Sequence, residues 1–402
     1  MDPHADEAAL VARIAALERL KAAAAAGQAR AAAALDERRR AAEAAAGVPA
    51  AKRGRGVASE VALAGGDSPA RGGRHLGFAK ALVYEMPNTL AALQTGVLSE
   101  WRATLVVRES ACLALADRQA LDTELCADTA ALAGVGDGRL AAAAKAIAYR
   151  LDPQAVVDQA ARAETQRRVT IRPAPDTMTW LTALLPVAQG VSVYAALRRS
   201  ADTTFDERSR DQVMADTLVE RVTGRPAQAP TPVAVNLIIS DDALLGGAAT
   251  PAVISGYGPI PAAVGRQLVG HALRDKRSAT TLRRLYARPD TKALVAMESR
   301  SRCFPRGLAH FIAMRDQQCR TPFCDAPIRH RDHIRSHSQG GPTSAANGRG
   351  TCEQCNYVKE GTGWQVTAQE QDGRHVTEYT TPTGARYRST APPLPMPPRH
   401  AA

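Results

Sequence analysis

The chain has 402 residues, which is enough for two or three domains with buried cores. Its 51 Lys and Arg residues outnumber its 40 Asp and Glu residues, and the net charge of +11 favours an anionic partner. Arginine, glutamate and aspartate interrupt the alanine runs, so no stretch has the character of a membrane span. The N-terminus lacks the pattern of a signal peptide, so we expect a cytoplasmic protein without membrane contact.

The N-terminal segment, residues 5–46, is rich in alanine and predicts a long helix. Its larger apolar residues recur at helical spacing, namely Leu10, Ile14, Leu17 and Leu20. We interpret this helix as a docking or short coiled-coil element through which oligomers could form. The basic, glycine-containing segment at 52–56 is interpreted as a connector.

The pattern stays helical over residues 58–163, and strand character appears only later in the chain. Short runs at 169–171 and 233–239 predict strands, and the segment 209–222 between them predicts an amphipathic helix. The segment 256–261 predicts a turn that leads into another helix. We therefore expect residues 1–300 to form a mainly α-helical domain with minor β structure and no catalytic site.

Four of the seven cysteines form two close pairs, Cys319-x4-Cys324 and Cys352-x2-Cys355. An odd total with two close pairs suits bound metal in a reducing compartment better than disulfides. Four thiolates match the closed tetrahedral site of structural zinc, which stabilises a small domain and leaves no open position for catalysis. The alternatives are an iron–sulfur cluster, which also uses four thiolates, and ordinary buried cysteines.

The polar residues between the cysteine pairs predict a strand, a turn, a second strand and a helix. Asp332 and His333 are expected on a strand, Gly340-Gly341-Pro342 predicts the turn, and Asn356 is expected on or near the helix. The segment 344–347 is expected to start a short helix that ends near the second cysteine pair. A histidine beside a carboxylate that binds a hard cation suits phosphodiester hydrolysis, with the imidazole taking a proton from water.

Basic residues accumulate in the same part of the chain. From residue 300 to the end there are 14 Lys and Arg residues against 8 Asp and Glu residues, a net charge of +6. The densest run consists of Arg300, Arg302, Arg306, Arg315, Arg320, Arg329, Arg331 and Arg335. Such a run is either a solvated face or a surface that binds phosphate groups.

Taken together, these residues resemble a known motif over residues 315–366. The string is Asp332-His333-Ile334, Gly340-Gly341, Asn347, Cys352-x2-Cys355-Asn356 and Lys359. It resembles the HNH endonuclease motif of the McrA type, a ββα-metal fold. The rest of the chain resembles actinobacterial HNH proteins with an N-terminal helical domain of unknown function 222, the 13E12 repeat family. The segments that carry this second resemblance are 258–261, 283–286, 304–308 and 381–384.

The resemblance implies a role for each matched position. It implies that His333 is the general base and that Asn347 fixes the loop that orients it. Asp332 and Asn356 would hold a catalytic Mg2+ or Mn2+ ion, since both offer oxygen ligands. For Lys359 the resemblance suggests a phosphate contact, and the alternative is an ordinary surface lysine. Many relatives have a His-His pair where this chain has Cys355-Asn356, which leaves the identity of the catalytic ion open.

We therefore expect an HNH endonuclease that hydrolyses phosphodiester bonds in double-stranded DNA. Its zinc-stabilised ββα domain is expected at 301–366, followed by a short β-like segment and a disordered Pro-rich tail at 367–402. Arg329, Arg331, Arg335 and Lys359 are the expected DNA-binding residues. The alternative is a zinc-stabilised DNA-binding or regulatory protein without cleavage activity, which would need none of Asp332, His333 and Asn356.

Overall fold

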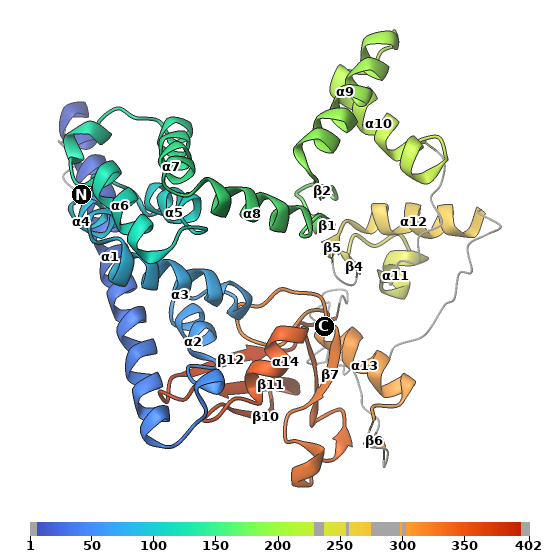
Figure 1. Cartoon of the computed structure of the whole chain (residues 1–402). Helices are drawn as coiled ribbons and strands as arrows, with labels where there is room; N and C mark the ends of the chain where they lie inside the picture. Colours follow the sequence, from blue (N-terminus) through green and yellow to red (C-terminus); the bar gives the residue numbers. More distant parts are fainter. Residues whose placement is uncertain (1–5, 229–236, 255–256, 275–297, 300–302, 395–402) are drawn as a thin grey trace.

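The computed structural model describes residues 6–228, 237–254, 257–274, 298–299 and 303–394 (Figure 1). Helices dominate the first half of the chain, and most of the described strands lie in the C-terminal region. The expectation of a mainly helical N-terminal part with minor β structure is confirmed. Among the residues described, none of the helices is both long and apolar enough to cross a membrane.

Eight α-helices occupy the described region up to residue 164. They are α1 (Glu7–Ala45), α2 (Val57–Ala64), α3 (Gly72–Lys80), α4 (Pro87–Thr95), α5 (Glu100–Glu109), α6 (Leu115–Cys126), α7 (Asp137–Leu151) and α8 (Pro153–Glu164). The predicted long helix is thus present as α1, and the side chain of Asp6 caps its first turn. Alanines in the second half of α1 are buried against α3 and α4, where their small side chains allow close packing. A second apolar cluster joins α4, α5, α6 and α7.

The first half of α1 presents an apolar stripe to solvent. Leu10, Val11, Ile14, Leu17 and Leu20 are each between 40% and 66% exposed. The coiled-coil interpretation of this stripe stays a prediction.

Two strands and two helices follow α8. They are β1 (Arg168–Pro173), β2 (Thr179–Leu184), α9 (Val187–Thr203) and α10 (Arg210–Thr223). The predicted strand near 169–171 is present as β1, which pairs antiparallel with β2. The predicted amphipathic helix is α10, which starts with a reciprocal capping box between Ser209 and Gln212.

A small antiparallel sheet and two helices come next. They are β3 (Leu237–Ile238), α11 (Asp241–Leu244), β4 (Ala252–Ile254), β5 (Gly258–Ile260) and α12 (Ala262–Arg274). The segment 258–260 is therefore a strand rather than the predicted turn, because it pairs with β4. It does lead into a helix, as expected. Of the strand predicted at 233–239, residues 233–236 lie outside the described part.

The C-terminal region contains two helices and most of the strands. The elements are β6 (Glu298–Ser299), α13 (Arg306–Asp316), β7 (His330–His333), β8 (Thr343–Ser344), β9 (Gly348–Thr351), α14 (Glu353–Lys359), β10 (Gln365–Gln371), β11 (Arg374–Thr380) and β12 (Arg386–Thr390). The predicted helix at 344–347 is wrong. Ser344 pairs with β6, residues 345–347 form a turn, and the helix starts only after Cys352.

Strands β10, β11 and β12 form an antiparallel sheet where a short β-like segment was expected. Helix α2 lies beside this sheet (Figure 1). The backbone N–H of Thr383 donates to Glu60 Oε1 at 3.0 Å, and Gln354 on α14 donates to the Pro69 carbonyl at 3.4 Å. The helical region thus contacts the C-terminal region directly.

Candidate functional site

The site is built on the antiparallel pair β7–β9 and the helix α14 that follows β9. The strand register places Asp332 opposite Arg349 and His333 opposite Gly348. Neighbouring residues of a strand point to opposite faces, so the carboxylate and the imidazole leave the ribbon on different sides. The predicted layout of Asp332 and His333 on a strand and Asn356 on a helix is confirmed.

The four paired cysteines come together at one end of this unit. All four thiols are buried, and their sulfur atoms lie within 4.8 Å of one another. Cys324 Sγ and Cys352 Sγ are 3.9 Å apart, which is far too long for a disulfide. Four sulfurs around a zinc ion at about 2.3 Å would be separated by roughly 3.8 Å. The cluster could therefore hold one zinc ion in a closed tetrahedral site.

The local structure and the chemistry of this cluster also suit a metal. Cys352 caps α14, and its sulfur accepts the backbone N–H of Cys355 at 3.5 Å. Hydrogen bonds from Cys324, and then from Cys352 and Cys355, lower the pKa of the Cys319 thiol, whereas the hydrogen bonds with Cys319 raise the pKa of Cys324 and Cys355. A thiolate in this position is the form that binds metal.

Asp332 is held between two cationic side chains. Its Oδ2 accepts a hydrogen bond from Nε of Arg349 at 2.9 Å, and its Oδ1 accepts one from Nζ of Lys359 at 2.8 Å. The Arg349 side chain is fully buried, and it lies over the ring of Tyr379 with its guanidinium carbon 4.9 Å from the ring centre. Each carboxylate oxygen of Asp332 therefore accepts a hydrogen bond from a different cationic side chain.

The Lys359 side chain contacts His333 as well as Asp332. Its ammonium also donates to the His333 carbonyl at 2.6 Å, and its side chain is only 8% exposed. A phosphate contact by Lys359 would require this side chain to leave Asp332. Asn356, one turn earlier on α14, is partly exposed, and no side chain within the described ranges hydrogen-bonds to its amide.

The imidazole of His333 has a defined orientation. Its Nε2 lies 2.9 Å from the hydroxyl of Thr343, and its ring centre lies 4.3 Å from that of Phe304. The ring of His337 is 5.7 Å away. The histidine is half-buried, so solvent reaches it while its neighbours restrict the ring.

Asn347 fastens the loop between β7 and β8. Its amide Nδ2 donates to the carbonyls of Arg335 and Pro342 at 3.0 and 2.8 Å, and its Oδ1 accepts from the Arg335 backbone at 2.9 Å. The loop turns at Gly340, where φ is +78°. A side chain on Gly341 would collide with the Arg335 carbonyl at 1.9 Å. These contacts explain why the loop needs two glycines and an asparagine.

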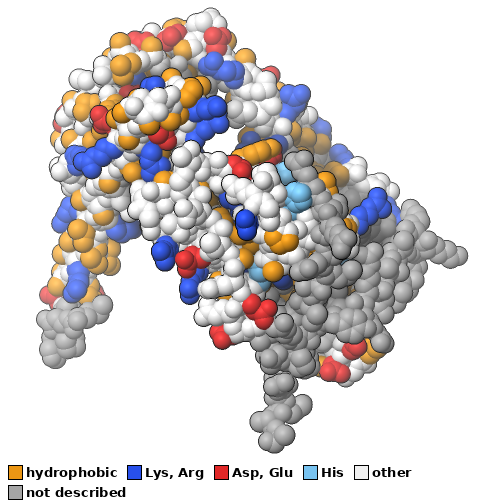
Figure 2. Space-filling view, turned by 90° about the horizontal axis from the view of Figure 1, so that it is seen from below, with side chains coloured by type: hydrophobic (Ala, Val, Ile, Leu, Met, Phe, Trp, Pro, Cys, Tyr) orange, Lys and Arg blue, Asp and Glu red, His pale blue; other side chains and the backbone are white. Residues whose placement is uncertain are grey.

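The arginines of the basic run divide into two groups. Arg306, Arg329, Arg331 and Arg335 are exposed, whereas Arg315 and Arg320 are buried, and Arg300 and Arg302 lie outside the described part. Figure 2 shows Lys and Arg side chains at several separate places on the face seen from below. The interpretation of the whole run as a phosphate-binding surface is therefore wrong for its two buried members.

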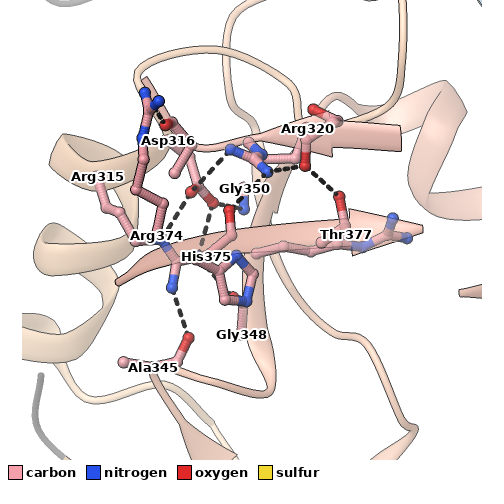
Figure 3. A network of polar contacts seen from close by, with 12 residues as sticks. Arg315, Asp316, Arg320, Ala345, Gly348, Gly350, Arg374, His375 and Thr377 are labelled. Atoms are coloured by element: carbon pink, nitrogen blue, oxygen red, sulfur yellow. Dashed lines mark hydrogen bonds and ion pairs between the residues drawn. The ribbon is translucent and has the colours of Figure 1, made fainter. Parts of the chain in front are cut away.

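The two buried arginines belong to a polar network inside the domain (Figure 3). Arg315 forms two contacts with Asp316, at 2.7 and 3.0 Å, and Asp316 Oδ2 accepts the backbone N–H of Gly350 at 2.7 Å. Arg315 also donates to the Gly348 carbonyl at 2.7 Å. Arg320 donates to backbone carbonyls of the β10–β12 sheet. These residues therefore join α13, β9 and the C-terminal sheet.

Comparisons with known families match two successive parts of the chain. The family described as "Domain of unknown function (DUF222)" matches residues 10–316, about three quarters of the chain. The chain belongs to the DUF222 family. The family described as "HNH endonuclease" matches residues 317–361, which contain the cysteine cluster and Asp332, His333, Asn347 and Lys359. No curated protein and no solved structure matches the chain.

The DUF222 chain thus carries a C-terminal HNH domain, which supports a nuclease-type function in general. Sequence analysis did not single out Arg349 or Thr343, although both contact the predicted site residues. The Gly-Arg-Gly run around Arg349 is the one signal for it, because an arginine between two glycines on a strand is unusual. Nothing in the sequence marks Thr343.

Proposed function

We propose that this DUF222 protein is a metal-dependent endonuclease that hydrolyses phosphodiester bonds in double-stranded DNA. The observation that carries the proposal is the combination of a restrained, partly exposed His333 with Asp332 on the same strand and Asn356 on the helix α14. The HNH match over the same residues supports it. A module that only binds DNA would need none of these three side chains.

His333 acts as the general base in this proposal. Thr343 and Phe304 hold the ring, so the imidazole can take a proton from a water molecule in a fixed direction. Asn347 acts indirectly, because it fixes the loop that carries Thr343.

Asp332 and Asn356 are the proposed ligands of the catalytic divalent cation. A carboxylate and an amide oxygen are donors that Mg2+ and Mn2+ accept. The Asn356 amide has no competing hydrogen bond within the described residues, and Asp332 has Lys359 on one oxygen. Bound there, a divalent cation would neutralise charge on the phosphate and on the leaving oxygen. The residues fit such an ion provided that Lys359 moves away from Oδ1.

DNA would lie across the exposed side of β7 and its loop in this proposal. Arg329 and Arg331 are exposed beside Asp332 and His333, and Arg335 is exposed at the start of the loop. Together they offer three positive charges to a phosphate backbone. The zinc held by the cysteine cluster would keep β7, β9 and α14 in register.

One observation favours the alternative, a zinc-stabilised DNA-binding protein without cleavage activity. Both oxygens of Asp332 accept hydrogen bonds from cations, Arg349 on one side and Lys359 on the other. If Lys359 stays in place, it fills the position next to Asp332 that a divalent cation needs. The same domain would then bind DNA through its arginines alone.

The test is cleavage of supercoiled plasmid by the purified full chain with Mg2+ or Mn2+. We expect the wild type to nick or linearise the plasmid, and we expect His333→Ala and a chelator-treated sample to leave it supercoiled. The zinc content of His333→Ala should match that of the wild type, because His333 does not contact the cysteine cluster.

Two other outcomes would reject the proposal. If neither protein cuts across a range of metals and salt concentrations, while both shift DNA in a gel, the protein is the DNA-binding alternative. Equal cutting by wild type and His333→Ala would show either that His333 is not the base or that the activity belongs to a contaminant.

A further inference from the structure

Residues 168–223 form an arm that has almost no core of its own. The arm consists of β1, β2, α9 and α10, and Val213 is its one buried residue. In Figure 1, α9 and α10 stand apart from helices α1–α7, with α8 leading toward them. The arm touches the rest of the chain at its hairpin turn, where Tyr257 donates to the Ala174 carbonyl at 3.0 Å.

The hairpin of the arm exposes an aliphatic face. The register pairs Ile171 with Leu181 and Val169 with Ala183, so these four side chains share one side of the ribbon. Val169, Ile171 and Leu181 are 64%, 70% and 54% exposed. An isolated two-stranded ribbon is marginally stable in water, and an apolar sheet face normally packs against a second layer.

The exposed apolar surface continues over the two helices. Thirteen of the 26 large hydrophobic side chains that are exposed in the described part lie in this arm. They are Val169, Ile171, Met178, Trp180, Leu181, Leu184, Val187, Val191, Val193, Tyr194, Phe205, Val219 and Val222. At roughly 100 Å2 each, eight of them would supply the approximately 800 Å2 per partner that a standard stable interface buries.

Charge indicates which kind of partner covers this surface. The arm contains seven arginines and seven acidic residues, a net charge of zero, whereas the whole chain carries +11. A surface for nucleic acid would be basic, so the neutral arm does not suit a polyanion. Nearly all of the excess positive charge lies after residue 223, so two copies that meet at their arms bring little net charge together. A flat aliphatic face is also self-complementary, as an interface with two-fold symmetry requires.

We propose that the arm is a dimerisation element that packs against the arm of a second copy of this chain. The aliphatic face of the β1–β2 hairpin forms the centre of the interface, and α9 and α10 extend it. Dimerisation supplies the second layer that the hairpin lacks within its own chain. The proposal is independent of the nuclease function, because none of the site residues lies in the arm.

Light scattering coupled to size-exclusion chromatography of the full chain tests this proposal without DNA. We expect a mass of twice 42.5 kDa for the wild type at tens of micromolar. The variant Ile171→Asp/Leu181→Asp should run at 42.5 kDa, with its dissociation constant raised at least 100-fold. The matched control is Leu17→Asp on the exposed stripe of α1, which should stay dimeric.

The double variant could be monomeric because it folds poorly. Hydrogen exchange of the wild type at two concentrations therefore tests the same interface without any substitution. We expect amides of residues 168–184 to lose protection on dilution, while those of α4 and α5 keep theirs. A monomeric wild type would overturn the proposal. A double variant that stays dimeric, or dissociation by Leu17→Asp alone, would also overturn it.

Discussion

The ammonium of Lys359 lies 2.8 Å from Oδ1 of Asp332, the carboxylate proposed to bind the catalytic cation. Lys359 therefore occupies the side of Asp332 that faces α14, where Asn356 also lies. A divalent ion and this ammonium would repel each other at such a separation. Metal binding and release of Lys359 are coupled in this arrangement.

The variant Lys359→Met should consequently bind divalent ions more tightly. Removing the competing charge from a mostly buried position should raise Mn2+ affinity at least about tenfold, which corresponds to about 1.4 kcal/mol. Isothermal titration of zinc-loaded protein with Mn2+ measures this directly, without DNA. The control is Lys145→Met, whose side chain is 69% exposed on α7. Unchanged or weaker Mn2+ binding by Lys359→Met would show that the two cations do not compete.

The cysteine cluster should bind one zinc ion per chain, and the HNH domain should depend on it. We expect Cys352→Ser to lose the zinc and to unfold the C-terminal region, because the metal contributes on the order of 10 kcal/mol to such small domains. Elemental analysis and thermal melting measure both effects. Cys303→Ser is the matched control, since Cys303 is exposed and lies outside the cluster. Full zinc content in Cys352→Ser would contradict the assignment.

Asn347 should act on activity through the loop rather than through the zinc site. Asn347→Ala removes three hydrogen bonds to backbone groups of Arg335 and Pro342. Leaving these groups unpaired should cost about 1–3 kcal/mol of local stability. We expect faster hydrogen exchange over residues 335–342 and at least tenfold slower plasmid nicking, with zinc content unchanged. Gln339→Ala, an exposed position in the same loop, should change neither, and normal exchange in Asn347→Ala would refute this role.

The exposed arginines on β7 and just before it should contribute phosphate contacts that do not depend on the DNA sequence. The double variant Arg329→Gln/Arg331→Gln should weaken binding equally for different DNA sequences. Each lost contact should reduce the slope of log K against log salt by about 0.9. The control pair is Arg386→Gln/Arg388→Gln, on β12, with side chains 72% and 56% exposed. If the slope of log K against log salt changes equally in both double variants, Arg329 and Arg331 do not form a specific part of the DNA-binding surface.

Features set by local sequence were predictable. The helix over α1 follows from alanine content, and the cysteine cluster follows from two close pairs at a suitable separation. The helix predicted at 344–347 failed because tertiary pairing overrides the helix propensity of two alanines. Ser344 joins β6, and the side chain of Asn347 binds backbone groups of the loop.

Features set by long-range register were not predictable. Arg349 reaches Asp332 because β9 pairs with β7 in one particular register, and a shift by one residue would turn its side chain to the other face. Arg315 and Arg320 belong to a run that looks like a solvated surface in the sequence. They are buried because the Asp316 carboxylate and backbone carbonyls from β9 and the C-terminal sheet surround them, an arrangement that only the folded chain creates.

His375 should make the C-terminal region less stable as the pH falls. Burial, together with the nearby charge of Arg315, lowers the pKa of His375 to about 4 from its ordinary value of 6.5. The unfolded chain therefore binds a proton more readily than the folded chain between these two values. This contribution to stability is complete above about pH 6.5 and is lost progressively as the pH falls to about 4, by up to about 3 kcal/mol.

Chemical denaturation of the wild type and His375→Gln between pH 4 and pH 7.5 measures this contribution. The glutamine side chain of the variant cannot take up the proton, so the difference in unfolding free energy between the two proteins should change with pH in that window and stay constant above it. His330→Gln is the control, because His330 is partly exposed on β7. Parallel curves for wild type and His375→Gln would show that His375 does not carry the pH dependence.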